Sequence, residues 1–214
     1  RNEGFRNPTI YELYGTDNYG YAGNKNLKAE KSISNEIYLE TNYSNKISVS
    51  IKGFKSKIND QIEYQSNKYV NNSKGLSLKQ SGINSEIAIK GNDYTLNLFS
   101  SFLSSDKVGG SPQLRRPEKT YGLNLQKNFI NNFFGKFSLN LNYNHYGKHF
   151  DTHSSTYSTI EMDSTDIVDI SLNRKFGTYD LVFNVSNLLD EKYQRPHGYS
   201  QNDRLYNLTL KTNF

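Results

Sequence analysis

The sequence predicts an all-β protein: an antiparallel transmembrane β-barrel, of which the chain forms the C-terminal portion with about nine strands. Three observations predict this fold. Apolar and polar residues alternate along most of the chain, short and long connections follow one another, and aromatic residues gather near the ends of the alternating stretches. Only every second residue of a barrel strand faces lipid. This explains how 214 residues can be 34% hydrophobic, with a mean hydropathy of −0.80, and still 14% aromatic.

Composition excludes several other classes of protein. A disordered chain would lack the aromatic residues, and a transmembrane helix would need about 20 consecutive apolar residues, which are not found here. The absence of Cys excludes disulfides, thiolate metal sites and cysteine nucleophiles. The net charge is +5, but the Lys residues are dispersed rather than clustered, so we expect no nucleic-acid partner.

The alternation places the strands in order along the chain. Residues 1–7 contain the tip of a first strand, and residues 32–44 alternate apolar odd positions with polar even ones. Further strands are expected over 46–53, 82–90, 94–102, 121–129, 137–143, 168–176, 181–185 and 206–214. No stretch keeps a period of about 3.6 residues, so helices should be few and short.

The connections alternate in length. Short turns rich in Gly, Asn or Asp are expected at 44–46, 91–93, 130–135 and 177–179. Long connections are expected at 8–31, 55–81, 103–118, 147–165 and 190–204. Periplasmic turns of outer-membrane barrels are short and their extracellular loops are long. If the C-terminal residue Phe214 lies in the periplasm, counting the strands backwards puts every short turn on the periplasmic side and every long loop outside.

The placement of aromatic and charged residues separates a membrane barrel from a soluble sandwich, which also alternates. Aromatic residues lie at the predicted periplasmic strand ends: Tyr43, Tyr94, Phe129, Phe133, Phe134, Phe176, Tyr179 and Phe214. The face opposite the apolar one carries charges suited to a wet or plugged lumen: Glu36, Glu40, Lys52, Glu86, Lys90, Asp169 and Lys211. The exceptions on the apolar face, Lys127 and Arg174, lie two residues before an aromatic, where a long side chain can reach the headgroups.

The last residues of the chain suggest an assembly signal. Phe214 ends the chain, and Tyr206, Leu208 and Leu210 lie on the same face of the last strand. This pattern resembles the terminal signal by which the barrel assembly machinery recognises its clients, although Thr212 interrupts the apolar face.

Three further segments contain more specific sequence motifs. Residues 4–15 read Gly-Phe-Arg-Asn-Pro-Thr-Ile-Tyr-Glu-Leu-Tyr-Gly, residues 24–32 read Asn-Lys-Asn-Leu-Lys-Ala-Glu-Lys-Ser, and residues 187–193 read Asn-Leu-Leu-Asp-Glu-Lys-Tyr. They resemble segments of the TonB-dependent outer-membrane receptors, with Lys25 and Ala29 standing where the family has prolines. Within that family, residues 112–117, 147–151 and 198–200 are most similar to text of the cobalamin (vitamin B12) receptors.

The resemblance implies an outer-membrane receptor that takes up a scarce, bulky nutrient without covalent chemistry or a cofactor. It implies a barrel of about 22 strands with a plugged lumen, so residues 1–214 are expected to be the C-terminal part of one barrel domain. It also implies an N-terminal plug, a TonB-binding segment, and contacts with membrane lipid and lipopolysaccharide. The expected ligand is cobalamin, with a siderophore (a ferric chelate) as the alternative. A small complete barrel, either a porin or a barrel enzyme, also stays open, and the upstream sequence would decide.

Loop residues are the candidates for ligand contact. Arg115 and Arg116 could bind an anionic ligand, or alternatively lipopolysaccharide phosphates. Loop tyrosines could stack on a bulky ligand, or simply pack the loops: Tyr14, Tyr19, Tyr21, Tyr64, Tyr69, Tyr157 and Tyr199. No metal site is expected at His145, His149 and His153, because residues four apart on a strand lie about 13 Å apart. No catalytic constellation is present.

Overall fold

A computed structural model describes residues 1–72, 77–106, 112–131 and 135–212. Ten strands form one sheet in the order β1-β2-β3-β6-β7-β8-β9-β12-β13-β14. The prediction of an all-β antiparallel protein with about nine strands and the tip of another is therefore confirmed. The strands are β1 (Asn2–Arg6), β2 (Glu30–Ser44), β3 (Ile47–Asn59), β6 (Ser77–Lys90), β7 (Tyr94–Ser105), β8 (Lys119–Asn131), β9 (Gly135–Tyr146), β12 (Thr165–Phe176), β13 (Tyr179–Ser186) and β14 (Leu205–Thr212).

The chain divides into two compact units. Unit 1 comprises Arg1–Ile37, Gly53–Gly82 and Leu103–Gln113, and unit 2 comprises Tyr38–Lys52, Ile83–Phe102 and Leu114–Phe214. Because the boundaries fall within several strands, each unit holds part of the sheet together with the connections at those strand ends.

Unit 1 contains the ordered parts of two long connections. Helix α1 (Ile10–Tyr14) begins after Thr9, whose hydroxyl accepts from the Glu12 N–H while the Glu12 carboxylate accepts from the Thr9 N–H. Such reciprocal capping stabilises a helix start, which matters for a helix of five residues. Strands β4 (Ile62–Gln65) and β5 (Lys68–Asn71) form a hairpin. Its turn residues Ser66 and Asn67 both have positive φ, as a tight hairpin turn requires.

The predicted long connection over 55–81 is present, but it is shorter than expected and contains a hairpin. β3 runs to Asn59 and β6 begins at Ser77, with the β4–β5 hairpin between them. The apolar positions are odd at Ile47, Val49 and Ile51 but even at Phe54 and Ile58. This change of phase near Gly53 hides the continuation of β3 from a search for strict alternation.

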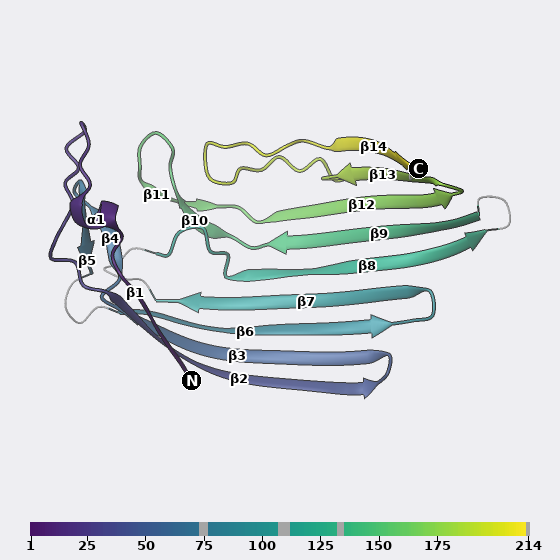
Figure 1. Ribbon diagram of the computed structural model, residues 1–214, viewed down its shortest axis with the longest axis horizontal. Coiled ribbons are helices and arrows are strands. Elements are labelled where there is room, and N and C mark those ends of the chain that lie inside the picture. The colour runs from purple at the N-terminus through teal and green to yellow at the C-terminus, as the bar shows by residue number, and fades with distance from the viewer. Residues whose placement is uncertain (73–76, 107–111, 132–134, 213–214) are drawn as a thin grey trace. The chain divides into compact units, whose positions relative to one another are not determined.

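Unit 2 carries the short turns at one end of its strands and longer segments at the other (Figure 1). The predicted turns between β2 and β3, β6 and β7, and β12 and β13 are present. The predicted turn between β8 and β9 includes residues 132–134, which lie outside the described residues. Phe133 and Phe134 of the predicted aromatic band are therefore not described. The predicted long connection at 147–165 is present between β9 and β12, and it contains the hairpin of β10 (His149–Thr152) and β11 (Thr159–Met162).

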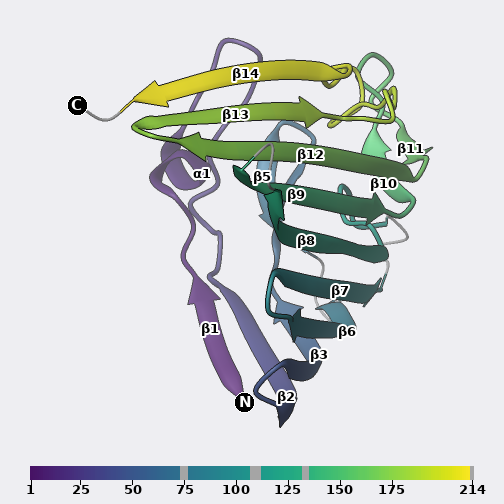
Figure 2. The ribbon, with the colours of Figure 1, turned by 90° about the vertical axis from the view of Figure 1, so that its right-hand side faces the viewer.

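The strand registers of unit 2 define two chemically distinct faces. Along one row Leu96 pairs with Leu125, Leu125 with Leu141, and Leu141 with Ile170. On the other face Asn97 pairs with Asn124, Asn124 with Asn142, and Asn142 with Asp169. Figure 2 shows β8, β9, β12, β13 and β14 side by side in this order. The predicted apolar and polar faces are therefore confirmed across these strands.

The apolar face of unit 2 is largely uncovered. Leu208 and Leu210 are 67% and 60% exposed, and Leu172 and Phe183 are also exposed. In the described part of this unit the buried apolar residues are only Ile167 and Val185. A face this apolar is unsuited to water and indicates contact with another apolar medium. Among the described residues, no helix is long and apolar enough to cross a membrane.

An aromatic band lies at the turn end of the apolar face. The Phe129 and Phe137 rings stack with centroids 4.8 Å apart, and those of Phe176 and Tyr179 lie 5.7 Å apart. Lys127 Nζ lies 5.4 Å from the Phe129 ring, and the Arg174 guanidinium lies 5.8 Å from the Phe176 ring. Both cations therefore reach the strand end, as expected of side chains that extend toward headgroups.

The last strand ends at the turn end of unit 2. Tyr206, Leu208 and Leu210 pair with Val185, Phe183 and Leu181, which places them on the apolar face. Thr212 pairs with Tyr179, the first residue after the short turn between β12 and β13. Phe214 lies outside the described residues. The assembly role of these residues remains a prediction.

Candidate functional site

The loop end of unit 2 is organised around the carboxylate of Asp151, a residue that is only 1% exposed. Oδ1 accepts hydrogen bonds from Arg115 Nε at 2.8 Å and from the Thr152 N–H at 2.7 Å. Oδ2 accepts from the His197 N–H at 2.9 Å. One side chain thereby joins three segments that are far apart in sequence. These segments contain residues 112–117, 147–151 and 198–200, which the sequence singled out separately.

The three hydrogen bonds to Asp151 favour the ionised form of its carboxyl group. Burial disfavours the charged carboxylate, but the hydrogen bonds from Arg115 and from the His197 and Thr152 amides outweigh burial. The pKa of Asp151 is therefore lowered from its ordinary value. At neutral pH the carboxylate is ionised and tied to three donors, which makes it a fixed anchor rather than a group available for proton transfer.

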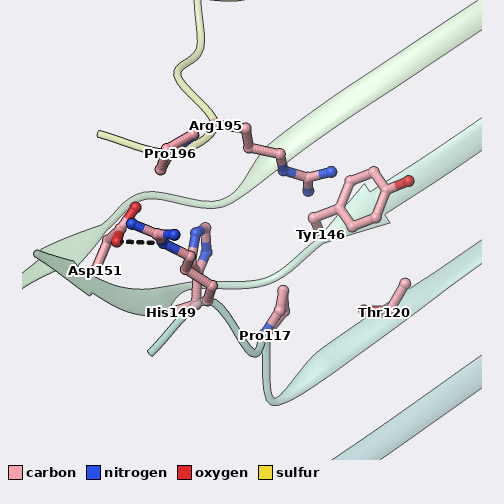
Figure 3. A pocket seen from close by; sticks show the side chains of 8 residues that line it. Pro117, Thr120, Tyr146, His149, Asp151, Arg195 and Pro196 are labelled. Atoms are coloured by element: carbon pink, nitrogen blue, oxygen red, sulfur yellow. Dashed lines mark hydrogen bonds and ion pairs between the residues drawn. The ribbon is translucent and has the colours of Figure 1, made fainter. Parts of the chain in front are cut away.

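A pocket of about 360 Å³ lies beside this anchor (Figure 3). Residues from β8, β9, β10 and the neighbouring segments line it: Arg115, Pro117, Thr120, Tyr146, His149, Asp151, Arg195 and Pro196. Thr120 pairs with Tyr146, and both are on the polar face of the sheet with Gly122 and Asn144. The pocket therefore belongs to the polar face, at the end of the strands where the long segments lie.

The Arg195 side chain gives the pocket its chemistry. Its guanidinium carbon lies 3.6 Å from the centroid of the Tyr146 ring, and Figure 3 shows it directed toward that ring. Stacking on an aromatic face leaves the guanidinium N–H donors free at its edge. In the described part of the chain, Arg195 has no carboxylate partner. The pocket can therefore offer planar, charge-assisted hydrogen bonds to a carboxylate, a phosphate or a similar anion.

The segment after β13 is shaped by Asn187, which is 5% exposed. Its backbone has a φ of +51°, a left-handed conformation that Asn tolerates better than most residues. The side chain accepts from the Glu191 N–H at 2.9 Å and donates to the carbonyls of Glu191 and Asn202. Its own N–H donates to Asp169 Oδ1 at 2.8 Å. The segment 187–193, whose sequence resembles the receptor family, therefore forms a bend that directs the chain toward Arg195.

Two family-like segments also meet within unit 1. Arg6 donates from Nε and Nη2 to Glu30, at 2.7 and 3.2 Å, and from Nη1 to both carboxylate oxygens of Glu12 at 3.1 Å. Glu30 also accepts from the Ile62 N–H at 2.7 Å. One arginine thereby connects the first strand, the helix and the start of β2.

Three of the five predicted tyrosines of unit 1 form a cluster with Tyr11. The Tyr21 ring stacks on Tyr11 at 4.7 Å and lies 6.1 Å from Tyr64 and 5.9 Å from Tyr69. Tyr21 is only 4% exposed and its hydroxyl donates to the Tyr11 carbonyl. The interpretation of Tyr21 as a ligand contact does not fit this burial, which makes it a packing residue instead. Tyr14, Tyr19 and Tyr64 are exposed.

The other predicted contact residues occupy varied positions. Arg115 is bound to Asp151, whereas Arg116 is exposed and forms no ion pair with the described residues. Tyr157 and Tyr199 are 80% and 67% exposed and are not among the pocket residues.

Of the eight pocket residues, only Arg115 was among the predicted contact residues. The seven that sequence reasoning missed are Pro117, Thr120, Tyr146, His149, Asp151, Arg195 and Pro196. A sequence signal existed for His149 and Asp151, which lie within the singled-out segment 147–151. The predicted histidine ladder is dispersed: His145 bonds Asp166 at 2.8 Å, while His153 faces His197. Within the described ranges, no group of three or more His, Asp or Glu side chains could hold a metal ion.

Comparison with known proteins decides the family. Residues 2–188 match the family described as "TonB dependent receptor-like, beta-barrel". The chain belongs to this family. A search of curated proteins gave no match.

Solved structures of the family share the fold of this receptor chain. The pyoverdine outer membrane receptor FpvA from Pseudomonas aeruginosa PAO1 has a TM-score of 0.71 at 15% identity, covering 88% of this chain and 30% of that one. The ferric-catecholate import receptor Fiu from K12 E. coli has a TM-score of 0.70 at 15% identity, covering 95% and 31%. The ferric yersiniabactin uptake receptor FyuA from Yersinia pestis has 0.69 at 16% identity, covering 97% and 32%. The receptor chain thus spans about a third of the length of these proteins.

Proposed function

We propose that the protein is an outer-membrane receptor that takes up a bulky, anionic metal chelate in a TonB-dependent manner. The observation that carries this proposal is the lumen-side pocket beside Asp151, in which the stacked guanidinium of Arg195 has no acidic partner among the described residues. An arginine held in this way at the mouth of a barrel is suited to capture an anionic group from outside.

A ferric siderophore is the first candidate ligand. The solved structures with the same fold include receptors named for pyoverdine, ferric catecholate and ferric yersiniabactin. Carboxylate or catecholate oxygens of such a ligand match the donors of Arg195. The exposed tyrosines Tyr14, Tyr19, Tyr64, Tyr157 and Tyr199 offer further rings for stacking.

Cobalamin is the second candidate. Its support is that two of the segments most similar to cobalamin receptors, 112–117 and 147–151, meet at Asp151, and that His197, which precedes the third, donates to the same carboxylate. The phosphate of cobalamin would be an equally suitable partner for Arg195. Both candidate ligands therefore require the pocket to bind an anionic group. A binding measurement distinguishes them by which ligand saturates the receptor.

The remaining partners follow from the proposed transport. The apolar face contacts outer-membrane lipid and lipopolysaccharide, and the polar face surrounds a plug domain that responds to TonB. Residues 1–214 then form the C-terminal part of the barrel, with the short turns and C-terminus in the periplasm. The assembly machinery recognises Tyr206, Leu208 and Leu210 of the last strand together with the C-terminal residue Phe214. No catalytic step is required.

Equilibrium binding to the purified full-length receptor tests the proposal. Cyanocobalamin and a panel of ferric siderophores are titrated against wild type, Arg195→Ala and Arg116→Ala. Arg195→Ala should weaken binding of the preferred ligand by about tenfold or more, since loss of one charge-assisted contact corresponds to about 1.4 kcal/mol or more. Arg116→Ala removes an equal charge from an exposed position and should change affinity less than about threefold.

The ligand panel also separates the alternatives. Saturable siderophore binding without cobalamin binding selects the first candidate, and the reverse selects the second. Free diffusion of small solutes without saturable binding of either class would indicate a porin and would overturn the proposal.

A further inference from the structure

Two histidines from different segments of unit 2 face each other beside the Asp151 anchor. His153 follows β10, and His197 follows the pocket residue Pro196. Their ring centroids are 4.5 Å apart, with an angle of 35° between the ring planes. Both residues are half-buried, and neither lines the pocket.

Each ring accepts backbone hydrogen bonds at the same nitrogen. His153 Nδ1 accepts from the N–H groups of Ser155 and Thr156, both at 3.2 Å. His197 Nδ1 accepts from the Ser154 N–H at 3.1 Å. An imidazole nitrogen can accept only when it carries no proton. The arrangement therefore requires both rings to be neutral, with their single protons on Nε2.

This tautomer is unsuited to metal binding. A metal bound at Nε2 would require the proton to move to Nδ1, where it would face the backbone N–H donors instead of an acceptor. The geometry is instead sensitive to protonation. A proton added at Nδ1 removes the acceptor, and two imidazolium rings at this separation repel each other.

We propose that His153 and His197 form a pH-sensitive latch that holds residues 153–158 against residues 195–200 when neutral and releases them in acid. Imidazole is the side chain whose charge ordinarily changes between about pH 5 and 8. Because the closed latch needs neutral rings, its stabilising contribution is present at the upper end of this range and is lost as the pH falls.

The latch connects directly to the pocket. The residue preceding His197 lines the pocket, and the His197 N–H donates to Asp151. Other ionisable groups held by the same segments are Asp151, Arg115, Arg195 and His149. Asp151 has a lowered pKa and stays ionised over this range. His149 is the further imidazole among these groups, so its substitution must be tested separately.

Hydrogen exchange of the full-length receptor tests the latch without any ligand. Exchange of peptides covering residues 153–158 is measured at about pH 8 and about pH 5.5 and corrected for the intrinsic pH dependence of exchange. The amides of Ser154, Ser155 and Thr156 should lose about tenfold or more of their protection at the lower pH.

Paired substitutions distinguish a titrating latch from a packing contact. In His153→Asn/His197→Asn, the amide oxygen can occupy the position of Nδ1 and accept without titrating, so protection should persist at both pH values. In His153→Ala/His197→Ala, protection should be low at both. His149→Asn and His145→Asn should keep the wild-type pH dependence. Equal protection of wild type at both pH values, or a pH dependence that survives in the double Asn variant, would overturn the latch.

The effect on ligand uptake rests on the proposed function and has a separate readout. If the pocket binds the chelate, wild type should lose about tenfold in affinity from pH 8 to pH 5.5, and the double Asn variant should not. If the amides behave as expected while affinity is the same at both pH values, the latch stands and the assignment of the pocket fails.

Discussion

Arg6 and Glu30 are 24 residues apart and are joined by two hydrogen bonds, of 2.7 Å from Nε and 3.2 Å from Nη2. Their backbones are direct partners in the β1–β2 register. Because Arg6 also binds Glu12, the strand pair and the helix share one guanidinium. The side chains of Glu12 and Glu30 are only 11% and 17% exposed. Water would therefore solvate the two carboxylates poorly if Arg6 were lost.

Replacing Arg6 should loosen unit 1. Arg6→Ala leaves two partly buried carboxylates without their cation, and we expect a local destabilisation of about 1–3 kcal/mol. Hydrogen exchange of the α1 amides, including Leu13 and Gly15, measures this opening. Arg1→Ala is the matched control, because the Arg1–Glu3 pair is 62% and 64% exposed and should contribute at most about 1 kcal/mol. Similar effects of the two variants would contradict the role of Arg6.

Replacing Asp151 should release three segments of unit 2 together. Asp151→Ala leaves Arg115 Nε and two backbone N–H groups without an acceptor, which should cost about 2–4 kcal/mol of local stability. Protease cleavage between residues 147 and 200 should become correspondingly faster. Asp163→Ala provides the control, since Asp163 is 95% exposed and lies 3.6 Å from Lys148. That substitution should change stability by less than about 0.5 kcal/mol.

The lowered pKa of Asp151 predicts a specific acid response. A carboxylate whose pKa is lower in the folded state contributes stability above its unfolded pKa of about 3.9 and loses it as the pH falls further. The contribution of Asp151 to the hydrogen-exchange protection of residues 147–152 should therefore be constant above about pH 5. It should decline below about pH 4. Asp151→Asn should remove this decline. A decline of equal size in Asp151→Asn would assign it to another group.

Two substitutions at Asn187 separate backbone strain from lost hydrogen bonds. Asn187→Gly keeps the positive φ accessible but removes three side-chain hydrogen bonds, and Asn187→Ala adds the cost of a left-handed Ala. We expect a loss of about 2–3 kcal/mol for Gly and about 1 kcal/mol more for Ala. The urea midpoint of the segment, followed by hydrogen exchange, measures both. An equal loss would show that the conformation of Asn187 is unstrained.

Adjacent substitutions on β9 test which face meets lipid. Leu141→Lys places a charge in the middle of the apolar row and should cost about 2–4 kcal/mol, whereas Asn142→Lys points into the lumen and should cost under about 1 kcal/mol. The fraction of full-length receptor assembled in the membrane, read from its mobility in unheated gels, reports this difference. If Asn142→Lys assembled less well than Leu141→Lys, the assignment of the two faces would be reversed.

The long connections explain where sequence reasoning was insufficient. The change of phase at Gly53 concealed the last six residues of β3, 54–59, and the hairpin that follows. The contacts of Asp151 and Arg195 were also missed, because nothing in their local sequence indicates that one binds Arg115 and the other stacks on Tyr146. Both contacts depend on the path of loops, and no periodicity constrains that path.

The sequence by itself determined the strands, their two faces and the alternation of short turns with long connections. It could do so because side chains on a strand alternate by geometry, so that Leu125 and Gln126 must face opposite ways wherever the strand lies. Only the tertiary structure decided which loop residues meet. The carboxylate of Asp151 joins Arg115 to the His197 amide because three connections return to the same end of the sheet. These residues are far apart in the sequence, and local sequence patterns do not encode such contacts.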